Sequence, residues 1–223
     1  MKYALLRFFT KTCLSVNRSV FNSGSILWKS SLMIKGGVLK LNNCKLNRCN
    51  IRVFGTENLI MIDGELYKTD IRVNGNGNLV IIGKECKLAK TKIVVRGNNC
   101  KVLYGSGTTV GGSYVVCQGK DNYVSLGQGC MLSENIDIWS SDTHPIYDES
   151  NRIINYSKPI DIGNHVWLGK GVKILKGVTI GDNSIIGMDS LVTSDIESNS
   201  LNAGIPCHQI RKNINWDRIF IDC

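Results

Sequence analysis

The segment from Ser140 to Pro159 gathers polar and ionisable side chains, among them His144, Tyr147 and Arg152. Imidazole titrates near neutral pH, so a histidine on a loop can take a proton from a weak nucleophile such as a hydroxyl group. His144 also precedes Pro145, which restricts the backbone at this point. We therefore predict that His144 is a catalytic residue. The alternative for any single histidine is a surface or core residue without chemistry.

The elements that must position this segment are repeats of six residues. Apolar residues recur at a strict spacing of six, and a second series lies four residues after each member of the first. The first series is Ile162, Leu168, Ile174, Ile180, Ile186 and Val192, and the second is Val166, Val172, Val178, Ser184, Ser190 and Ile196. This period fits neither a helix nor a plain strand. It predicts short strands joined by corners into a triangular coil, with three repeats in each coil.

A longer period extends the pattern upstream, where Gly55, Gly75, Gly97 and Gly119 are spaced 20, 22 and 22 residues apart. The period lapses between residues 140 and 159, which we interpret as a loop extruded from the solenoid. The predicted fold class is all-β. The predicted organisation is a basic N-terminal capping segment (1–30), a β-helix domain (31–205) with the extruded loop 140–159, and a C-terminal tail (206–223).

Positive charge is concentrated at the N-terminus. The formal net charge is +9, and the first 52 residues contain ten Lys or Arg and no acid. Such a segment suits an anionic partner such as an acidic polymer or a lipid surface, although a solvated basic face is equally consistent with the composition. No nucleic-acid module is recognisable, so we expect no nucleic acid partner.

The N-terminal stretch and the cysteines give information about where in the cell the protein is located. Residues 3–20 are too short and too charged to span a bilayer, but they could form an amphipathic helix that caps the domain or lies on a membrane. The nine cysteines include no C-x-x-C pair. Their odd number and scattered positions argue against a zinc site or a full disulfide framework. We expect reduced thiols and a cytoplasmic location, with the inner face of the membrane as an open alternative.

Several ordered motifs resemble one family. They are Asp142-Thr-His144-Pro, the run Lys158-Pro-Ile-Asp-Ile-Gly-Asn-His-Val-Trp167-Leu-Gly169, the run Gly177-Val-Thr-Ile-Gly181-Asp-Asn-Ser-Ile-Ile-Gly187, and Ala203-Gly-Ile-Pro-Cys207. Together they resemble the hexapeptide-repeat acetyltransferases, particularly the branch that O-acetylates galactosides, maltose and capsular polysaccharides. The resemblance covers about residues 120–216. It implies a left-handed parallel β-helix, acetyl-CoA as co-substrate without a metal, and a homotrimer with active sites between neighbouring subunits.

The resemblance also implies roles for individual residues. His144 would be the general base that lets a sugar hydroxyl attack the acetyl thioester. Trp167 would line the active site, where its indole could stack on a sugar or cover the pantetheine arm; packing at a subunit contact is the alternative. Asp142 would orient the imidazole or only cap the loop.

By position in the family motifs, the coenzyme site falls on the last coils. The implied residues are Lys170, Met188, Thr193, Ser194, His208 and Arg211, with Lys212 in support. Two of them depart from the family pattern, because Met188 replaces the usual Ala and Ser194 replaces the usual Lys. The loss of that Lys removes one possible phosphate partner.

Three other functions stay open from the sequence. The acceptor could be an amino-sugar amine or a small molecule instead of a hydroxyl. The solenoid could be a non-enzymatic binding scaffold. A zinc-dependent γ-type carbonic anhydrase would need three histidines, and His144, His165 and His208 lack the close spacing of that class.

As the acceptor of the acetyl group we favour an acidic bacterial surface polysaccharide, such as a sialic acid-containing capsule or a lipopolysaccharide, because the basic N-terminal quarter could steer a polyanion.

Overall fold

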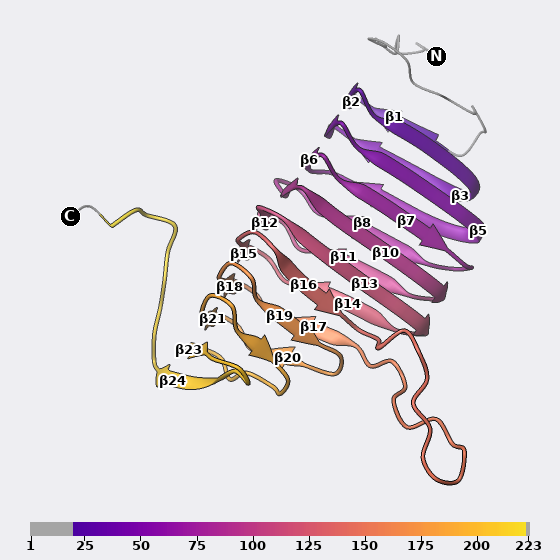
Figure 1. Ribbon diagram of the computed structural model, residues 1–223. Helices are drawn as coiled ribbons and strands as arrows, with labels where there is room; N and C mark the ends of the chain where they lie inside the picture. Colours follow the sequence, from indigo (N-terminus) through magenta and orange to yellow (C-terminus); the bar gives the residue numbers. More distant parts are fainter. Residues whose placement is uncertain (1–19, 222–223) are drawn as a thin grey trace.

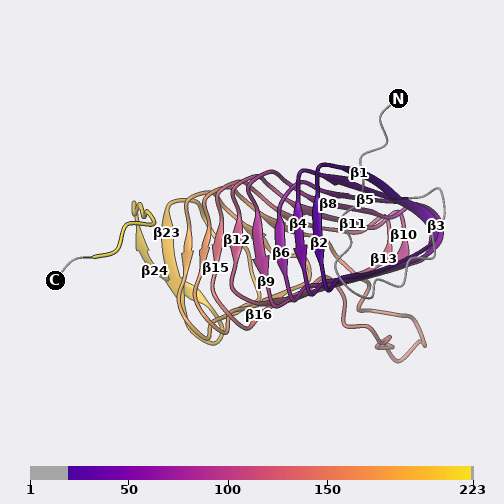
Figure 2. The ribbon, with the colours of Figure 1, turned by 90° about the horizontal axis from the view of Figure 1, so that it is seen from above.

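The computed structural model describes residues 20–221, which form a parallel β-solenoid with the C-terminal tail alongside it (Figure 1). Viewed from above, the coils lie side by side along the axis of the solenoid, from β1 and β2 toward one end to β23 and β24 at the other (Figure 2). The predicted left-handed parallel β-helix and all-β class are confirmed. Within residues 20–221, no helix has the length and hydropathy needed to cross a membrane.

Three faces, here named A, B and C, make up each coil. Face A comprises β2 (Ile26–Trp28), β4 (Lys45–Asn47), β6 (Glu65–Tyr67), β9 (Lys87–Ala89), β12 (Thr109–Val110), β15 (Met131–Leu132), β18 (Trp167–Leu168), β21 (Ile185–Ile186) and β23 (Ser200–Ala203), with β24 (His208–Lys212) antiparallel to β23. Face B comprises the first halves of β3 (Ser31–Asn42) and β5 (Asn50–Ile62), then β7 (Asp70–Asn74), β10 (Thr91–Asn98), β13 (Ser113–Lys120), β16 (Ile136–Trp139), β19 (Lys173–Leu175) and β22 (Leu191–Val192). Face C comprises β1 (Val20–Ser23), the second halves of β3 and β5, β8 (Leu79–Ile82), β11 (Lys101–Tyr104), β14 (Tyr123–Leu126), β17 (Ile160–Ile162) and β20 (Thr179–Ile180).

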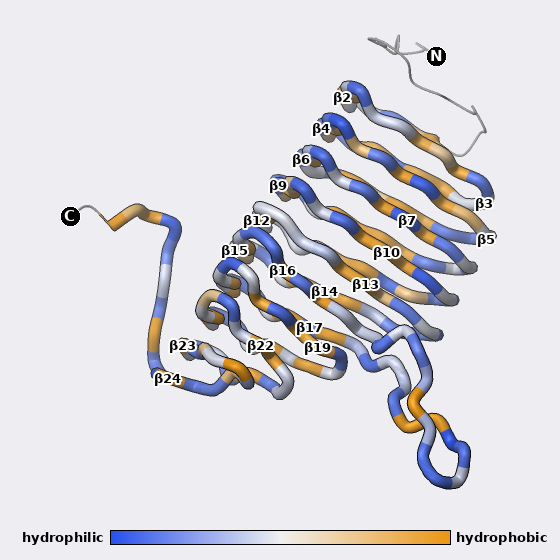
Figure 3. Tube along the Cα trace, viewed as in Figure 1, coloured by the Kyte–Doolittle hydropathy of each residue, from blue (hydrophilic) through white to orange (hydrophobic). Residues whose placement is uncertain are grey.

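The six-residue series fill the inside of the coil, as predicted. Every member of the first series is at most 1% exposed, and every member of the second is at most 7% exposed. Apolar and polar residues alternate along the strands, so each strand turns one side to the core and the other outward (Figure 3). The seven cysteines within the described residues are buried thiols, and all of them belong to this core.

The corner between faces B and C is tightly stacked. Gly55 and Gly75 adopt φ values of 111° and 120°, and a Cβ atom on Gly55 would lie 2.0 Å from the carbonyl oxygen of Gly75. Only glycine fits so close an approach at positive φ. Asn58 and Asn78 follow these glycines and form a buried ladder, in which Asn78 Nδ2 donates to Asn58 Oδ1 at 3.0 Å.

The solenoid begins earlier than predicted. Its predicted start was residue 31, but β1 and β2 already pair with the next coil. Residues 26–28 were not recognised as a strand of the solenoid in the sequence. Of the three apolar residues, only the central Leu27 packs against the core, while Ile26 and Trp28 are exposed. The predicted amphipathic segment lies mostly in residues 1–19, outside the described residues.

Replacing Asn78 with alanine tests the corner ladder. Asn78 donates to Gly97 O at 2.9 Å and accepts from the backbone N–H of Cys100 at 2.9 Å, so Asn78→Ala leaves buried polar groups without partners. We expect a loss of about 2–4 kcal/mol of unfolding free energy, measured by urea denaturation. The control Asn74→Ala removes an exposed amide and should change stability by less than about 0.5 kcal/mol. Equal stability of the two variants would contradict a structural role for the ladder.

Candidate active site

The extruded segment leaves the solenoid after β16 and returns at β17, at the corner between faces B and C (Figure 1). Its outer part is held by antiparallel contacts, with Tyr147 bridged to Ile153 and the backbone N–H of Ile154 donating to Ile146 O at 2.9 Å. The preceding coils have the glycine–asparagine corner at this place. The segment is therefore an enlarged corner, and the register resumes on face C where β17 pairs with β14 and β20.

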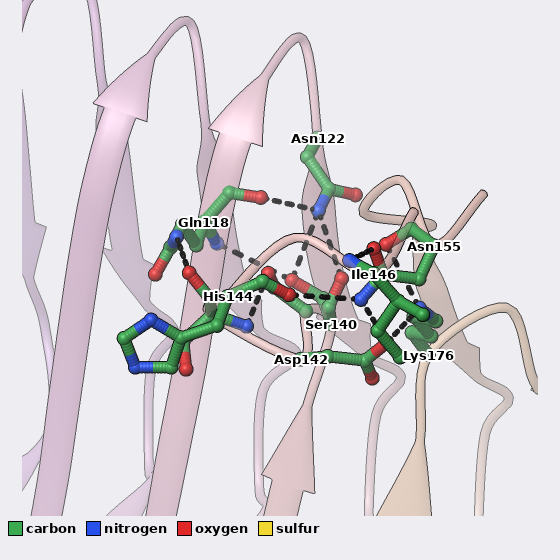
Figure 4. Close-up of polar contacts among 10 residues, drawn as sticks. Gln118, Asn122, Ser140, Asp142, His144, Ile146, Asn155 and Lys176 are labelled. Carbon is green, nitrogen blue, oxygen red and sulfur yellow. Dashed lines mark hydrogen bonds and ion pairs between the residues drawn. The ribbon is translucent and has the colours of Figure 1, made fainter. Parts of the chain in front are cut away.

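The coil before the loop anchors its first residues. Asn122 Nδ2 donates to Ser140 Oγ at 2.9 Å, and the backbone N–H of Gln118 donates to the same oxygen at 3.3 Å. Gln118 Nε2 also donates to the carbonyl oxygen of Thr143 at 3.4 Å (Figure 4). Both residues thus hold the chain immediately before His144.

A second cluster holds the loop from the other side. The ammonium group of Lys176 forms a close ion pair with the Asp142 carboxylate and donates to Asn155 O at 3.0 Å. Asn155 Nδ2 in turn donates to Asp142 Oδ2 and to the carbonyl oxygen of His144, both at 2.9 Å. The Lys176 ammonium, and then the Asn155 amide, hold the pKa of Asp142 below its ordinary value.

The imidazole of His144 points away from both clusters (Figure 4). The side chain is exposed, and within the described residues its ring nitrogens form no hydrogen bond, so they are open to a substrate. The Asp142 carboxylate contacts Lys176 and Asn155, and within the described residues it forms no hydrogen bond with the imidazole of His144. Its two predicted roles, orienting the imidazole and capping the loop, stay predictions.

Backbone strain lies beside the base. Thr143 has a φ of 66°, a left-handed conformation that is costly for a β-branched residue. The backbone N–H of Thr143 donates to Ser141 Oγ at 3.0 Å, and its carbonyl oxygen is held by Gln118. Such strain persists only where surrounding contacts impose it, and it is common at functional sites.

Trp167 lies far from His144 within one chain. It belongs to β18 on face A, whereas His144 projects from the corner between faces B and C. The indole is 37% exposed and lies 5.8 Å from the ring of Trp216 in the C-terminal tail. One chain therefore does not bring the predicted base and the predicted active-site tryptophan together.

The predicted coenzyme residues fall into two groups. Lys170 and Met188 are stacked at the corner between faces A and B, where the backbone N–H of Asp189 donates to Lys170 O at 2.8 Å. The His208 imidazole lies beside Gly204, at the end of β23 on the same side, and Arg211 is exposed on β24. By contrast, Thr193 and Ser194 follow β22 at the corner between faces B and C, the corner that carries the loop.

Several residues of the site were not predicted. They are Gln118, Asn155 and Lys176, together with Trp216, whose ring stacks on His165 at a centroid distance of 4.0 Å. Trp216 Nε1 also donates to His165 O at 2.9 Å, and this histidine contacts Asn183 Oδ1 through Nδ1 at 2.9 Å. The sequence signal for this contact was a tryptophan in a tail without the six-residue period.

The solenoid of six-residue repeats and the histidine on its extruded loop are features shared with transferases of the hexapeptide class. Residues 159–194 match the family described as bacterial transferase hexapeptide (six repeats). Over 95 residues the chain is 41% identical to galactoside O-acetyltransferase of Escherichia coli K12, a match that covers 42% of this chain and 46% of that protein. Polysialic acid O-acetyltransferase of Escherichia coli O1:K1 is 36% identical over 95 residues, which is 42% of this chain and 31% of that protein.

Solved structures extend the similarity over most of the chain. The polysialic acid O-acetyltransferase OatWY superimposes with a TM-score of 0.63 and 28% identity, covering 91% of this chain and 89% of that one. The polySia-specific acetyltransferase NeuO gives a TM-score of 0.60 and 28% identity, with coverages of 92% and 84%. The chain is therefore similar to hexapeptide-repeat acetyltransferases, in sequence over its second half and in fold over most of its length. It spans less than half the length of the curated relatives given above.

The clamp on the loop can be tested through Lys176. Because the folded-state pKa of Asp142 is lowered, the ion pair stabilises the loop above the ordinary pKa of aspartate and is lost as pH falls through the lowered value. We expect Lys176→Met to raise hydrogen exchange across residues 142–157 at neutral pH, and acidification of the wild type to do the same. Lys173 on β19 forms no ion pair within the part of the chain that the structure describes, so Lys173→Met should leave the exchange of the loop unchanged. Equal protection of the loop in both variants would contradict the clamp.

Proposed function

We propose that this protein is an acetyl-CoA-dependent O-acetyltransferase that modifies a sugar hydroxyl of an acidic bacterial surface polysaccharide. The observation that carries the proposal is His144, an exposed imidazole that forms no hydrogen bond among residues 20–221, on a loop whose base is held from both sides. Similarity across most of the chain to two polysialic acid O-acetyltransferases supports both the reaction and the acidic acceptor.

In this proposal the imidazole of His144 takes the proton from the acceptor hydroxyl as that oxygen attacks. Acetyl-CoA supplies the activated acetyl group as a thioester. Asn155 and Gln118 keep the loop in place by binding the carbonyl oxygens of His144 and Thr143, so the base is positioned before the substrate arrives. Asp142 contributes through the loop and not through the imidazole.

The donor set on the last coils fits the coenzyme. Lys170 and Arg211 are exposed, and within residues 20–221 neither forms an ion pair with a carboxylate, which leaves both cations for phosphate groups. Lys212 is engaged by Glu197 at 2.7 Å and is the weaker candidate. Met188 is 65% exposed at the corner above Lys170, where a flexible apolar side chain could contact a pantetheine arm.

The separation of His144 from Trp167 supports a site shared between copies of the chain, in a homotrimer. Face C offers an apolar outer surface to such a neighbour. Leu59 pairs in register with Leu79, and Met61 with Ile81, and all four are half-buried outside the core. Covering such a surface removes apolar area from water.

Loss of the base is the first test of the reaction. His144→Ala should lower acetyl transfer by about 10²- to 10⁴-fold while acetyl-CoA binding is kept, because only the proton transfer is removed. The measurement is release of the CoA thiol in the presence of acidic and neutral glycans, with Glu149→Ala on the same loop as the control. An unchanged rate for His144→Ala would reject the base, and transfer to amino sugars alone would reassign the acceptor to an amine.

Mixing two inactive variants tests whether the site is shared. His144→Ala lacks the base and Trp167→Ala lacks the tryptophan, but a mixed oligomer would contain some sites that carry both residues. We therefore expect the two variants, unfolded and refolded together, to recover activity that neither has alone. Absence of recovery, with mixed oligomers verified by mass spectrometry, would contradict a site built from both residues of neighbouring copies.

A further inference from the structure

Face B carries a run of cations on the coils that precede the loop. We name it the basic track, and its members are Lys35 on β3, Arg52 on β5, Arg72 on β7, and Lys92 and Arg96 on β10. All five point outward, because the residues that alternate with them, such as Ile51 and Val73, fill the core. The track lies on strands that stack side by side (Figure 1).

The track has more positive charge than its neighbours neutralise. Arg52 and Arg72 are directly paired in register and share one carboxylate, Asp70, at 3.6 Å and 2.6 Å. Within the described residues, none of the other three cations forms an ion pair, although Lys92 is paired in register with Asp70. Lys35 lies over the Phe54 ring at 6.0 Å, and Lys92 lies over the Tyr114 ring at 4.2 Å. Five cations thus share the outer side of face B with two acids, Asp70 and Asp137, so positive charge is in excess.

The track leads directly to the candidate base. Arg96 pairs in register with Gln118, and Gln118 Nε2 donates to Thr143 O beside His144. Neighbouring strands lie roughly 4.8 Å apart, so the four steps from β3 to β13 cover about 19 Å. Lys35 and Arg96 belong to the register column that ends at Gln118, whereas Arg52 and Arg72 belong to the neighbouring outward column. A polymer laid across face B would meet at least one track cation on each of β3, β5, β7 and β10 before it reached β13.

Aromatic rings lie where the track meets the loop. Tyr114 pairs in register with Asp137, and its ring packs edge-on against Trp139 at a centroid distance of 5.1 Å. Both rings are half-buried on the outer side of face B. Flat rings beside cations suit a sugar, which offers an apolar ring face together with charged and hydroxyl groups.

We infer that the basic track is an extended binding site for an acidic glycan chain, whose successive carboxylates face the cations of successive coils. The inference rests on the proposed O-acetyltransferase function, because the polymer on the track is the one whose hydroxyl group reaches His144. The remote units then supply binding energy, while a unit near Tyr114 and Trp139 is presented to the base.

The test is equilibrium binding without acetyl-CoA, so it needs no turnover. The ligands are a long α-linked sialic acid polymer, a sialic acid trisaccharide, and a neutral dextran of matched length. The track variant is Lys92→Gln/Arg96→Gln, and the control Lys45→Gln/Lys87→Gln removes two cations from face A. We expect the track variant to bind the long polymer about tenfold more weakly, with the difference shrinking at high salt, and the control to bind as the wild type does. In turnover, the KM for the polymer should rise while kcat is unchanged.

Four results would overturn the track: wild-type affinity of the track variant, equal loss in the control, equal affinity for dextran, or binding of anionic phospholipid vesicles but not of the polymer. The proposed reaction fails separately. A protein that binds the polymer through the track but transfers no acetyl group would keep this inference and reject the reaction. If the protein acetylates the trisaccharide and the track variant does not change binding of the long polymer, the proposed reaction stands and the track is rejected.

Discussion

In-register pairing of parallel strands from one coil to the next is the interaction on which the rest of this molecule depends. Many of its strands have only two or three residues and cannot be stable alone, so each relies on the coil above and the coil below. The register also fixes columns of equivalent side chains. Aliphatic residues repeat inward, asparagines repeat at one corner, and outward positions repeat in line on each face.

The extruded loop interrupts this register at one corner, and its neighbours compensate. The polar groups at its base lose the partners that a regular corner provides, and Gln118 and Asn122 from the previous coil bind them. Lys176 from the following coil holds the other side of the loop. Because these contacts come from rigid strands or their immediate ends, His144 is fixed in place by the stack and not by the loop alone.

Local periodicity explains what could be predicted and what could not. The inward series and the loop could be predicted, because a strict spacing of six and its lapse are visible in the sequence. The stacking of Lys170 and Met188 could also have been predicted, since they lie 18 residues apart, which is three repeats. The ion pair between Asp142 and Lys176 could not be predicted. The two residues are 34 positions apart, and because the extruded loop interrupts the six-residue period, the period does not show that they lie on adjacent coils. Trp216 reaches His165 through a tail without periodicity.

The side chains that point outward from the coils can include types that do not stabilise the fold, because the side chains that point inward form the core. Like charges placed directly opposite on neighbouring strands destabilise a sheet, and Arg52 opposite Arg72 is such a pair. Asp70 relieves the pair only in part, and Arg96 adds a further cation on the next coil. A local rule broken without full compensation is typical of a functional surface. On this argument, the cations of face B owe their positions to an anionic ligand, whereas the apolar residues inside the same coils owe theirs to the fold.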